Sequence, residues 1–397
     1  MPGPGSYLIS EDEKEYVNRV IDSKYLFRYG DYEDSKFTKS VYTLEQKFSN
    51  YIGVDYCVAT VSGTMALVNA LKTLGIGDGD EVLVPGYTYV ASFSAVISVG
   101  AIPVLTEINE SLTIDIHDIE NKITKKTKCI MPVHMIGNPC DMDSILEIAK
   151  NNNLFIIEDC CQAAGAIYKG KKVGSFGDFA AFSLNFYKTI TAGDGGLLVT
   201  NNKENYERAF AFHDQGHKPN RASSAIGDRN IIGLNLRMNE LTGAVALAQL
   251  NKIEFIVDTL RTKKSILKNN LNFDKSLANY RILNDADGEC GSIMTIVFFE
   301  KTKAKEFAKK LNTMTVSKSG WHVYSNMEHI NNFLKEVDYP NSIGALPVTD
   351  DILDRAVNIS IGVVDEGLGS GFGINILSSE DEIISIANQI NNAMSNL

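Results

Sequence analysis

Two short segments carry residue types suited to binding charge at the ends of apolar runs. Ser62-Gly63-Thr64 lies between an apolar run and a stretch with helical spacing, and the free N–H groups of a helix start can bind phosphate. Glu158-Asp159 closes the apolar run 154–157, where a carboxylate is costly unless a cation faces it. Each segment alone has an ordinary interpretation too: a helix cap for the first, a structural salt bridge or cap for the second.

Lys188 and Tyr89 are candidates for covalent and stacking chemistry. Lys188 follows the apolar run 179–183 and precedes a glycine-rich turn that leads into a second run, 196–200. A lysine that forms a Schiff base needs a lowered pKa, whereas most lysines are solvated surface groups. Tyr89 follows the run 81–85 and could stack on a planar ring, although a tyrosine at a strand end is more often part of a core.

The order and spacing of these segments are more informative than any one of them. A phosphate-binding turn, an aromatic residue, a strand-end acid and a lysine 29 residues further on (188 − 159) are the ordered parts of a pyridoxal-phosphate (PLP) site of fold type I. Asp159 would keep the pyridine nitrogen protonated, which makes PLP an electron sink. We therefore predict a PLP enzyme with Lys188 as its catalytic residue.

Apolar runs alternate with amphipathic stretches between about residues 55 and 200, and this alternation predicts the elements that position the site. The expected strands are 56–61, 81–85, 103–106, 129–133, 154–158, 179–183 and 196–200. The pattern predicts an α/β fold with a mainly parallel central sheet flanked by helices. A long amphipathic stretch, 239–269, leaves this sheet and precedes a smaller α/β domain. We expect a large PLP-binding domain with its N-terminal segment at 1–260 and a small C-terminal domain at 261–397.

Composition narrows the classes of protein and partner. The chain has 397 residues, 44% of them hydrophobic, and its net charge of −11 disfavours a nucleic-acid or acidic-membrane partner. The six cysteines follow neither a disulfide nor a CxxC pattern, and no signal peptide or membrane-spanning run is apparent, so a cytoplasmic protein is expected. His213 and His217 are four apart, but Gly216 disfavours a helix and no further ligand is evident, so we predict no metal site.

The chain resembles the DegT-type family of sugar aminotransferases, which are PLP enzymes of fold type I, along nearly its whole length. The resemblance rests on Ser62-Gly-Thr-Met-Ala-Leu67, Pro85-Gly-Tyr-Thr-Tyr-Val-Ala91, Pro132-Val-His134, Asp141-Met-Asp143, Glu158-Asp-Cys-Cys-Gln-Ala163, Phe182-Ser183, Lys188 with Gly193-Asp-Gly-Gly196, and Gly233-Leu-Asn-Leu-Arg-Met238. Two departures from the family pattern are Asp194 in place of glutamate and Cys160-Cys161 in place of small residues. Lys188 argues against the family's dehydratases, which carry histidine at that position.

The resemblance implies a role for each matching position. Lys188 would form the Schiff base with PLP and then carry the proton between the substrate carbon and the cofactor, while Asp159 would pair with the pyridinium nitrogen. Further cofactor contacts are implied for the ring hydroxyl (Gln162), the ring face (Tyr89) and the phosphate (Gly63, Thr64 and Ser183). Asn235 would reach the phosphate of the neighbouring subunit's cofactor, which implies a homodimer with shared active sites.

Within the family, the pattern is most similar to aminotransferases that make the 8-amino form of the lipopolysaccharide sugar 3-deoxy-manno-octulosonate. Segments 27–29, 133–135, 213–217, 233–237 and 321–322 carry this similarity. We therefore expect L-glutamate as the amino donor and 8-oxo-3,8-dideoxy-manno-octulosonate as the acceptor. The side chains expected to contact these substrates are Phe27, Arg28, His134, Arg237 and His322. Ion pairing at the subunit interface is an equally good interpretation of the two arginines.

Three other functions stay open at this point. A nucleotide-sugar aminotransferase would catalyse the same reaction on an acceptor that needs room for a nucleotide diphosphate. A PLP lyase or dehydratase would release its product without an amino donor. A non-catalytic PLP-binding regulator belongs to a different class, and neither a helix-turn-helix extension nor a basic patch is visible in support of it.

Overall fold

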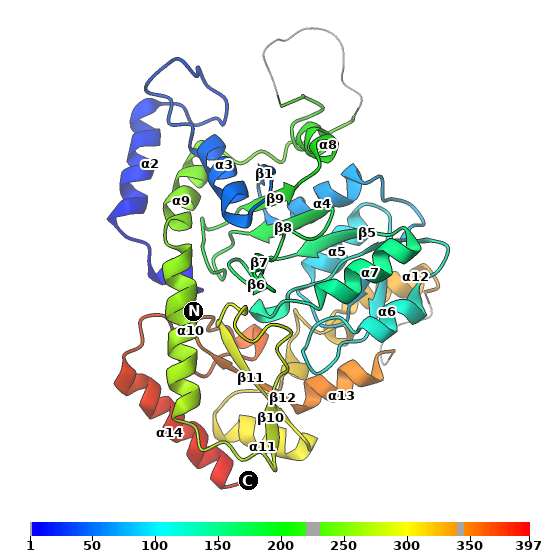
Figure 1. Ribbon diagram of the computed structural model, residues 1–397, viewed down its shortest axis with the longest axis vertical. Helices are drawn as coiled ribbons and strands as arrows, with labels where there is room; N and C mark the ends of the chain where they lie inside the picture. Colours follow the sequence, from blue (N-terminus) through cyan, green and yellow to red (C-terminus); the bar gives the residue numbers. More distant parts are fainter. Residues whose placement is uncertain (1, 220–230, 340–344) are drawn as a thin grey trace.

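The computed structural model describes residues 2–219, 231–339 and 345–397. Its larger part is built on a seven-stranded sheet with the order β1-β9-β8-β5-β4-β2-β3 (Figure 1). The strands are β1 (Tyr56–Thr60), β2 (Glu81–Pro85), β3 (Ile102–Thr106), β4 (Thr127–Ile130), β5 (Phe155–Asp159), β8 (Phe179–Ser183) and β9 (Gly196–Thr200). The strands from β8 to β3 pair in parallel, whereas β9 is antiparallel to both of its neighbours.

Apolar side chains cover both faces of this sheet. On β2, Leu83 belongs to the hydrophobic core on one face, and Val82 and Val84 belong to the core on the other. Parallel strands are buried in this way because the helices of the crossover connections cover them. The helices that follow the strands are α4 (Gly63–Thr73), α5 (Ala91–Ser98), α6 (Ile116–Lys122), α7 (Met142–Asn152) and α8 (Lys203–His213). The predicted α/β fold with a mainly parallel sheet is confirmed.

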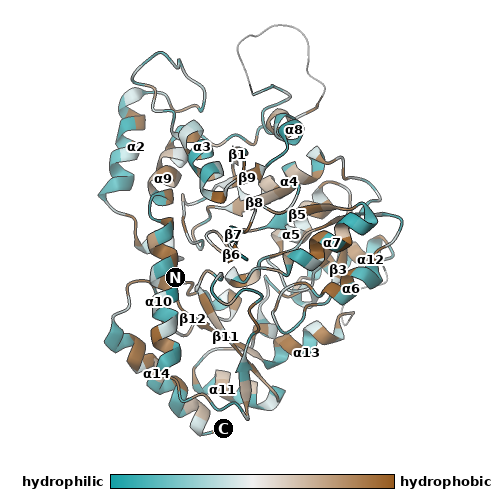
Figure 2. Cartoon of the chain, in the orientation of Figure 1, coloured by the Kyte–Doolittle hydropathy of each residue, from teal (hydrophilic) through white to brown (hydrophobic). Residues whose placement is uncertain are grey.

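The N-terminal helices pack against a helix from the middle of the chain. They are α1 (Pro4–Tyr7), α2 (Glu11–Ser23) and α3 (Ser40–Ile52), and both α2 and α3 contact α9 (Glu240–Leu250). Most of α9 is buried, and in Figure 2 it is largely white to brown where α2 is mostly teal. A helix with apolar residues on most sides is one that has neighbours on most sides.

The predicted amphipathic stretch 239–269 is two helices in the structure, α9 and α10 (Ile253–Asn269). At the break, the N–H of Lys252 donates to the carbonyl of Gln249, three residues back, with φ and ψ of −102° and −5°. α10 runs without interruption past residue 260 and joins the two parts of the molecule (Figure 1). The expected boundary between 1–260 and 261–397 therefore falls inside a helix, and the division into domains stays a prediction.

The C-terminal part is a small antiparallel sheet with helices around it. Its strands, in spatial order, are β10 (Ala278–Tyr280), β11 (Ile293–Phe298) and β12 (Ala356–Ser360). Its helices are α11 (Lys301–Lys310), α12 (Glu328–Glu336), α13 (Pro347–Arg355), α14 (Glu380–Ser395) and the 3₁₀ turns η2 (Val316–Lys318), η3 (Tyr324–Asn326) and η4 (Glu366–Leu368). The larger part also contains η1 (Met135–Gly137) and a short ribbon of β6 (Ile167–Tyr168) and β7 (Lys171–Lys172).

Candidate active site

A cavity of about 490 Å³ opens where the parallel strands of the large sheet end. Residues that directly follow or end β1, β2, β5 and β8 line it, as expected for a ligand site of an open α/β sheet. Seven of the residues predicted to bind the cofactor lie on its wall: Gly63, Thr64, Tyr89, Asp159, Gln162, Ser183 and Lys188. His322, one of the predicted substrate contacts, lies there as well.

The N-terminus of α4 forms one end of the cavity. Ser62 caps this helix by accepting a hydrogen bond from the N–H of Met65 at 3.2 Å. Gly63 allows a close approach, because a Cβ there would lie 2.8 Å from the Cβ of Ser183 and 2.9 Å from the Sγ of Cys161. The first N–H groups of an 11-residue helix, next to the hydroxyls of Thr64 and Ser183, suit a phosphate dianion.

Asp159 is the only carboxylate among the described residues that both ends a strand of the large sheet and lines the cavity. It is 5% exposed, and its Oδ2 accepts a hydrogen bond from the hydroxyl of Ser92 at 2.7 Å. Its Oδ1 accepts the N–H of Cys161 at 3.1 Å. A carboxylate can accept about four hydrogen bonds, so Asp159 keeps capacity for a cationic or N–H ligand.

Lys188, Tyr89 and Gln162 surround the middle of the cavity. The Nζ of Lys188 lies 5.8 Å from the centre of the Tyr89 ring, so an amine and an aromatic face border the same space. A backbone hydrogen bond orients Gln162: its Oε1 accepts the N–H of Ile136 at 3.1 Å. Its amide nitrogen is therefore left as a donor.

These groups fit PLP in number and kind. A helix N-terminus matches the phosphate, a buried acid with spare capacity matches a pyridinium N–H, a tyrosine face matches the ring, and a lysine amine matches the aldehyde. Because Gly63 has no side chain, the narrow space beside it stays open for a ligand.

The opposite wall comes from the C-terminal part of the chain. The N–H of Thr88 donates to the carbonyl of His322 at 2.9 Å, which fixes this segment against the large sheet. The hydroxyl of Ser319 donates to the carbonyl of Gly367, so it can only accept the bond that it shares with Nδ1 of His322. His322 therefore carries its proton on Nδ1 and offers Nε2 as an acceptor. Burial, and secondarily the charge of Lys188, lowers the pKa of His322 to about 3.

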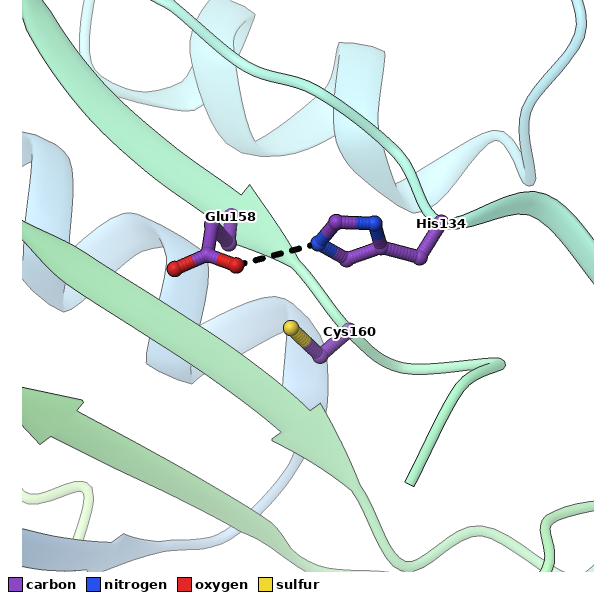
Figure 3. A group of neighbouring side chains, drawn as sticks. All are labelled: His134, Glu158 and Cys160. Carbon is purple, nitrogen blue, oxygen red and sulfur yellow. Dashed lines mark hydrogen bonds and ion pairs between the residues drawn. The ribbon is translucent and has the colours of Figure 1, made fainter. Parts of the chain in front are cut away.

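His134 lies outside the cavity, and the prediction that it contacts substrate is wrong. It is fully buried, its Nδ1 accepts the N–H of Cys140 at 2.9 Å and its Nε2 lies 3.1 Å from Oε2 of Glu158 (Figure 3). Glu158 also accepts the N–H groups of Gly174, Phe176 and Gly177 at 2.8 Å each. Both ring nitrogens of His134 are thus used inside the protein, and a substrate cannot reach them.

Figure 3 also places Cys160 beside this pair, and the possible ligand atoms of the three residues lie within 4.8 Å of one another. Such a group resembles a metal site. However, the four hydrogen bonds to Glu158 and the two to His134 already occupy the atoms that would bind an ion. Burial raises the pKa of the Cys160 thiol, which disfavours the thiolate that a metal requires.

Arg28 is likewise buried and does not line the cavity, so it makes no substrate contact within its own chain. Its Nη2 lies 3.0 Å from both carboxylate oxygens of Glu45, and its Nη1 donates to Nε2 of His213 at 2.9 Å. The structure thus places Arg28 in an ion pair within one chain, and its predicted contact with substrate or with a subunit interface stays a prediction.

Phe27 and Asn235 are exposed and Arg237 is largely buried, and all three lie outside the cavity of their own chain. Arg237 forms an ion pair with Asp214, and its guanidinium carbon lies 5.3 Å from the centre of the Phe27 ring. The N–H of Val61 donates to the carbonyl of Leu236 at 3.0 Å, which holds this segment next to the phosphate-binding turn. The predicted role of Asn235 in a neighbouring subunit stays a prediction.

Several residues of the cavity wall have no expected role from the sequence. They are Thr88, Asn185, Tyr187, Trp321 and Asp365. Ser92 does not line the cavity but acts through its hydrogen bond to Asp159. Tyr187 and Asn185 lie close before Lys188 in the chain, so their closeness to the lysine could have identified them as residues of the site. Asp365 reaches the wall only through the tertiary fold, and no local pattern marks it.

No helix in the part of the chain that the structure describes combines the length and the apolar character that a membrane span requires. The model of the DegT/DnrJ/EryC1/StrS aminotransferase family matches residues 8–364. The aminotransferase from Psychrobacter cryohalolentis has a similar structure, with a TM-score of 0.83 at 25% sequence identity over 100% of this chain and 99% of that one.

Two relatives are similar in sequence over about two thirds of the chain. GDP-perosamine synthase of Escherichia coli O157:H7 is 44% identical over 261 residues, which are 66% of this chain and 68% of that protein. The dTDP-3-amino-3,6-dideoxy-alpha-D-galactopyranose transaminase of Aneurinibacillus thermoaerophilus is 41% identical over 243 residues, 61% of this chain and 63% of that protein. Both are named for sugars carried on a nucleotide, and neither is named for an octulosonate. The chain belongs to the DegT/DnrJ/EryC1/StrS aminotransferase family and is a PLP-dependent transaminase.

Proposed function

We propose that this enzyme transfers the amino group of L-glutamate to an oxo-sugar carried on a nucleotide diphosphate, with Lys188 as its catalytic residue. The observation that carries the proposal is the cavity in which Lys188, Asp159 and Tyr89 meet at the N-terminus of α4. The similarity to relatives named for GDP- and dTDP-linked sugars supports the class of acceptor.

Each residue has a separate task in this proposal. Bound PLP supplies an electron sink for the substrate carbon. Lys188 would hold the cofactor through Nζ and, once displaced by the donor amine, would remove and return the proton at that carbon. Asp159, kept in place by Ser92, would hold the pyridinium proton. The N–H groups of Gly63 and Thr64, with the hydroxyl of Ser183, would bind the phosphate.

The hydrogen-bond acceptors of the cavity wall suit the hydroxyl groups of a sugar. Asp194 and Asp365 line the cavity, and the unprotonated Nε2 of His322 adds a neutral acceptor. Hydroxyl groups of a sugar can donate to all three. Arg28 and Arg237, the cations expected for an octulosonate, are both paired with carboxylates of this chain.

The test of the catalytic residue combines spectroscopy with chemical trapping. Purified protein with PLP should show the absorbance of lysine-bound cofactor, and glutamate should convert it to the amino form. Borohydride reduction followed by peptide mass spectrometry should then place the cofactor on Lys188. A Lys188→Ala variant that kept turnover, or trapping on another lysine, would refute the assignment. Lys188→Arg keeps the charge and serves as the matched control.

The test of the acceptor compares kcat/KM for three oxo-sugars with glutamate as donor. A GDP-linked and a dTDP-linked 4-oxo-6-deoxy sugar should both exceed 8-oxo-3,8-dideoxy-manno-octulosonate. A preference for the octulosonate would restore the substrate expected from the sequence. Product formation without a donor would identify a lyase or dehydratase, and absence of turnover with bound PLP would favour the regulator.

We also propose a homodimer in which the Asn235 segment of one subunit completes the cavity of the other. Asn235 is exposed, lies outside its own cavity and adjoins the phosphate-binding turn. Two inactive variants, Lys188→Ala and Asn235→Asp, should regain activity when co-expressed with different tags, because one site of the mixed dimer then has no substitution. Sedimentation at equilibrium gives the subunit number independently.

A further inference from the structure

The first residues of the described chain lie directly on the loop that carries Lys188. Residues 2–8, here called the N-terminal strap, contact residues 185–192, here called the lysine loop. The N–H of Gly3 donates to the carbonyl of Phe186 at 3.1 Å, and the hydroxyl of Ser6 donates to the same oxygen at 2.8 Å. The side chains at this point of the lysine loop give it little anchorage in the core, since Phe186 is 43% and Tyr187 is 42% exposed. The carbonyl of Phe186 is therefore held by the strap, while hydrogen bonds within the loop, such as that from the N–H of Lys188 to the carbonyl of Asn185 at 3.0 Å, hold the rest of its backbone.

Two glycines let the strap approach the loop more closely than any other residue would allow. A Cβ at Gly3 would lie 2.2 Å from the carbonyl carbon and oxygen of Tyr187 and 2.8 Å from the backbone nitrogen of Lys188. A Cβ at Gly5 would lie 2.8 Å from the Cα of Ile190. These neighbours are backbone atoms, so rotation of a side chain cannot relieve the overlap. The close contacts bracket Lys188 on both sides.

A buried polar network ties the far end of the lysine loop to the same strap. The Oε1 of Gln249 accepts the N–H of Thr191 at 3.3 Å, and its Nε2 donates to Oε1 of Glu13 at 2.8 Å. The ammonium of Lys252 bonds both Glu13 and the carbonyl of Leu8, the last at 2.9 Å. Gln249 is fully buried and Glu13 is 3% exposed. Hydrogen bonds of this kind are costly to break, because each leaves a buried group unpaired.

We propose that the N-terminal strap is a positioning element for Lys188, acting through the backbone of the lysine loop. The strap holds the carbonyl of Phe186, two residues before Lys188. Through Lys252, Glu13 and Gln249 it is also connected to the N–H of Thr191, three residues after Lys188. The side chain of Lys188 then starts from one backbone position, which keeps Nζ within reach of the cofactor and of the substrate proton. This inference rests on the proposed catalytic role of Lys188.

The test replaces Gly3 by alanine and compares it with Gly77→Ala. Gly77 has an ordinary φ, and a Cβ there would meet only the carbonyl of Val99 at 3.6 Å, so this control adds the same methyl group without strain. In Gly3→Ala we expect kcat to fall by about 10- to 100-fold with the acceptor KM changed less than twofold. The dissociation constant of PLP should rise, and amide exchange of peptides spanning 184–192 should accelerate in the protein without cofactor.

Ser6→Ala removes one hydrogen bond to Phe186 without adding an atom, so it gives an answer even if Gly3→Ala fails to fold. It should accelerate exchange of the same peptides by up to about 10-fold, the worth of one hydrogen bond. Exchange, PLP affinity and kcat that match those of Gly77→Ala would overturn the inference. Retained turnover of Lys188→Ala would overturn the proposed function and this inference together, whereas unchanged exchange in Gly3→Ala and Ser6→Ala would overturn the inference alone.

Discussion

The end of β5 presents two adjacent carboxylates to opposite faces of the large sheet. Glu158 accepts four hydrogen bonds, three from backbone N–H groups and one from His134, and it is fully buried. Asp159 accepts two, from Ser92 and Cys161, and borders the cavity. The same strand thus carries one carboxylate whose hydrogen-bond capacity is filled inside the protein and one that can still accept hydrogen bonds from a ligand. Spare hydrogen-bond capacity, more than burial, distinguishes the functional carboxylate.

The strongest test of this difference is Asp159→Asn. Asparagine keeps the shape but loses the charge that would face a pyridinium, so kcat should fall by about 100- to 1000-fold. The free energy of unfolding of the cofactor-free protein should fall by about 2 kcal/mol or less, because two hydrogen bonds are weakened while a buried charge is removed. Steady-state kinetics and urea unfolding measure the two effects. Activity within threefold of the unsubstituted enzyme would contradict the comparison.

Glu158→Gln should show the opposite pattern. One of the acceptor oxygens becomes an NH₂ group that faces N–H donors, and a buried charge network is broken, so the free energy of unfolding should fall by about 3 kcal/mol. The kcat of the folded fraction should stay within a few-fold. Unfolding curves followed by tryptophan fluorescence, together with active-site titration by PLP, separate stability from turnover. An equal loss in both variants would show that the two faces act as one unit.

His322 combines features of the two carboxylates. It is buried like Glu158, yet its Nε2 can accept a hydrogen bond from a ligand, as Asp159 can. Its pKa of about 3 lies below the ordinary value of 6.5, so below pH 6.5 the unfolded chain takes up a proton that the folded chain does not. Stability must then fall as pH falls through this window, by about 2 kcal/mol between pH 7 and pH 5. His322→Gln should lack this component, and parallel pH curves for the two proteins would contradict it.

The smallest expected effect comes from Ser92→Ala, which removes one of the two donors to Asp159. A hydrogen bond to a charged group contributes about 1.5 kcal/mol, so kcat should fall by about 10-fold. Ser98→Ala on the same helix is the matched control, because the hydroxyl of Ser98 bonds only the carbonyl of Ala95. Equal kinetics of the two variants would mean that Ser92 does not support Asp159.

The residues that the sequence located well are those whose position follows from local chain order. Lys188, Asp159 and Gly63 stand at strand ends, and the carboxyl ends of parallel strands meet at one edge of a sheet. For this reason the wall of the cavity could be predicted in large part from motif order. The alternation of apolar runs predicted the strands of the sheet for the same reason, to within two or three residues at their ends.

Residues whose role depends on distant partners could not be placed in this way. Arg28 and His134 have the chemistry of substrate contacts, but Glu45, His213 and Glu158 engage them inside the protein. Whether a polar side chain has spare capacity depends on groups 17 to 185 residues away in the chain, which no local pattern records. The octulosonate substrate, expected partly from those residues, stays a prediction.

The contact between the N-terminal strap and the lysine loop has a consequence for the order of folding. Lys252, which bonds Leu8, follows it by 244 residues. Synthesis proceeds from the N-terminus, so the strap is made before the lysine loop and α10 and cannot dock until both the lysine loop and the start of α10 have been made. Contacts of such large sequence separation form late, because the closure entropy of a long loop must be met before they contribute. In the proposed role of the strap, Lys188 therefore reaches its final position only after the start of α10 has been made.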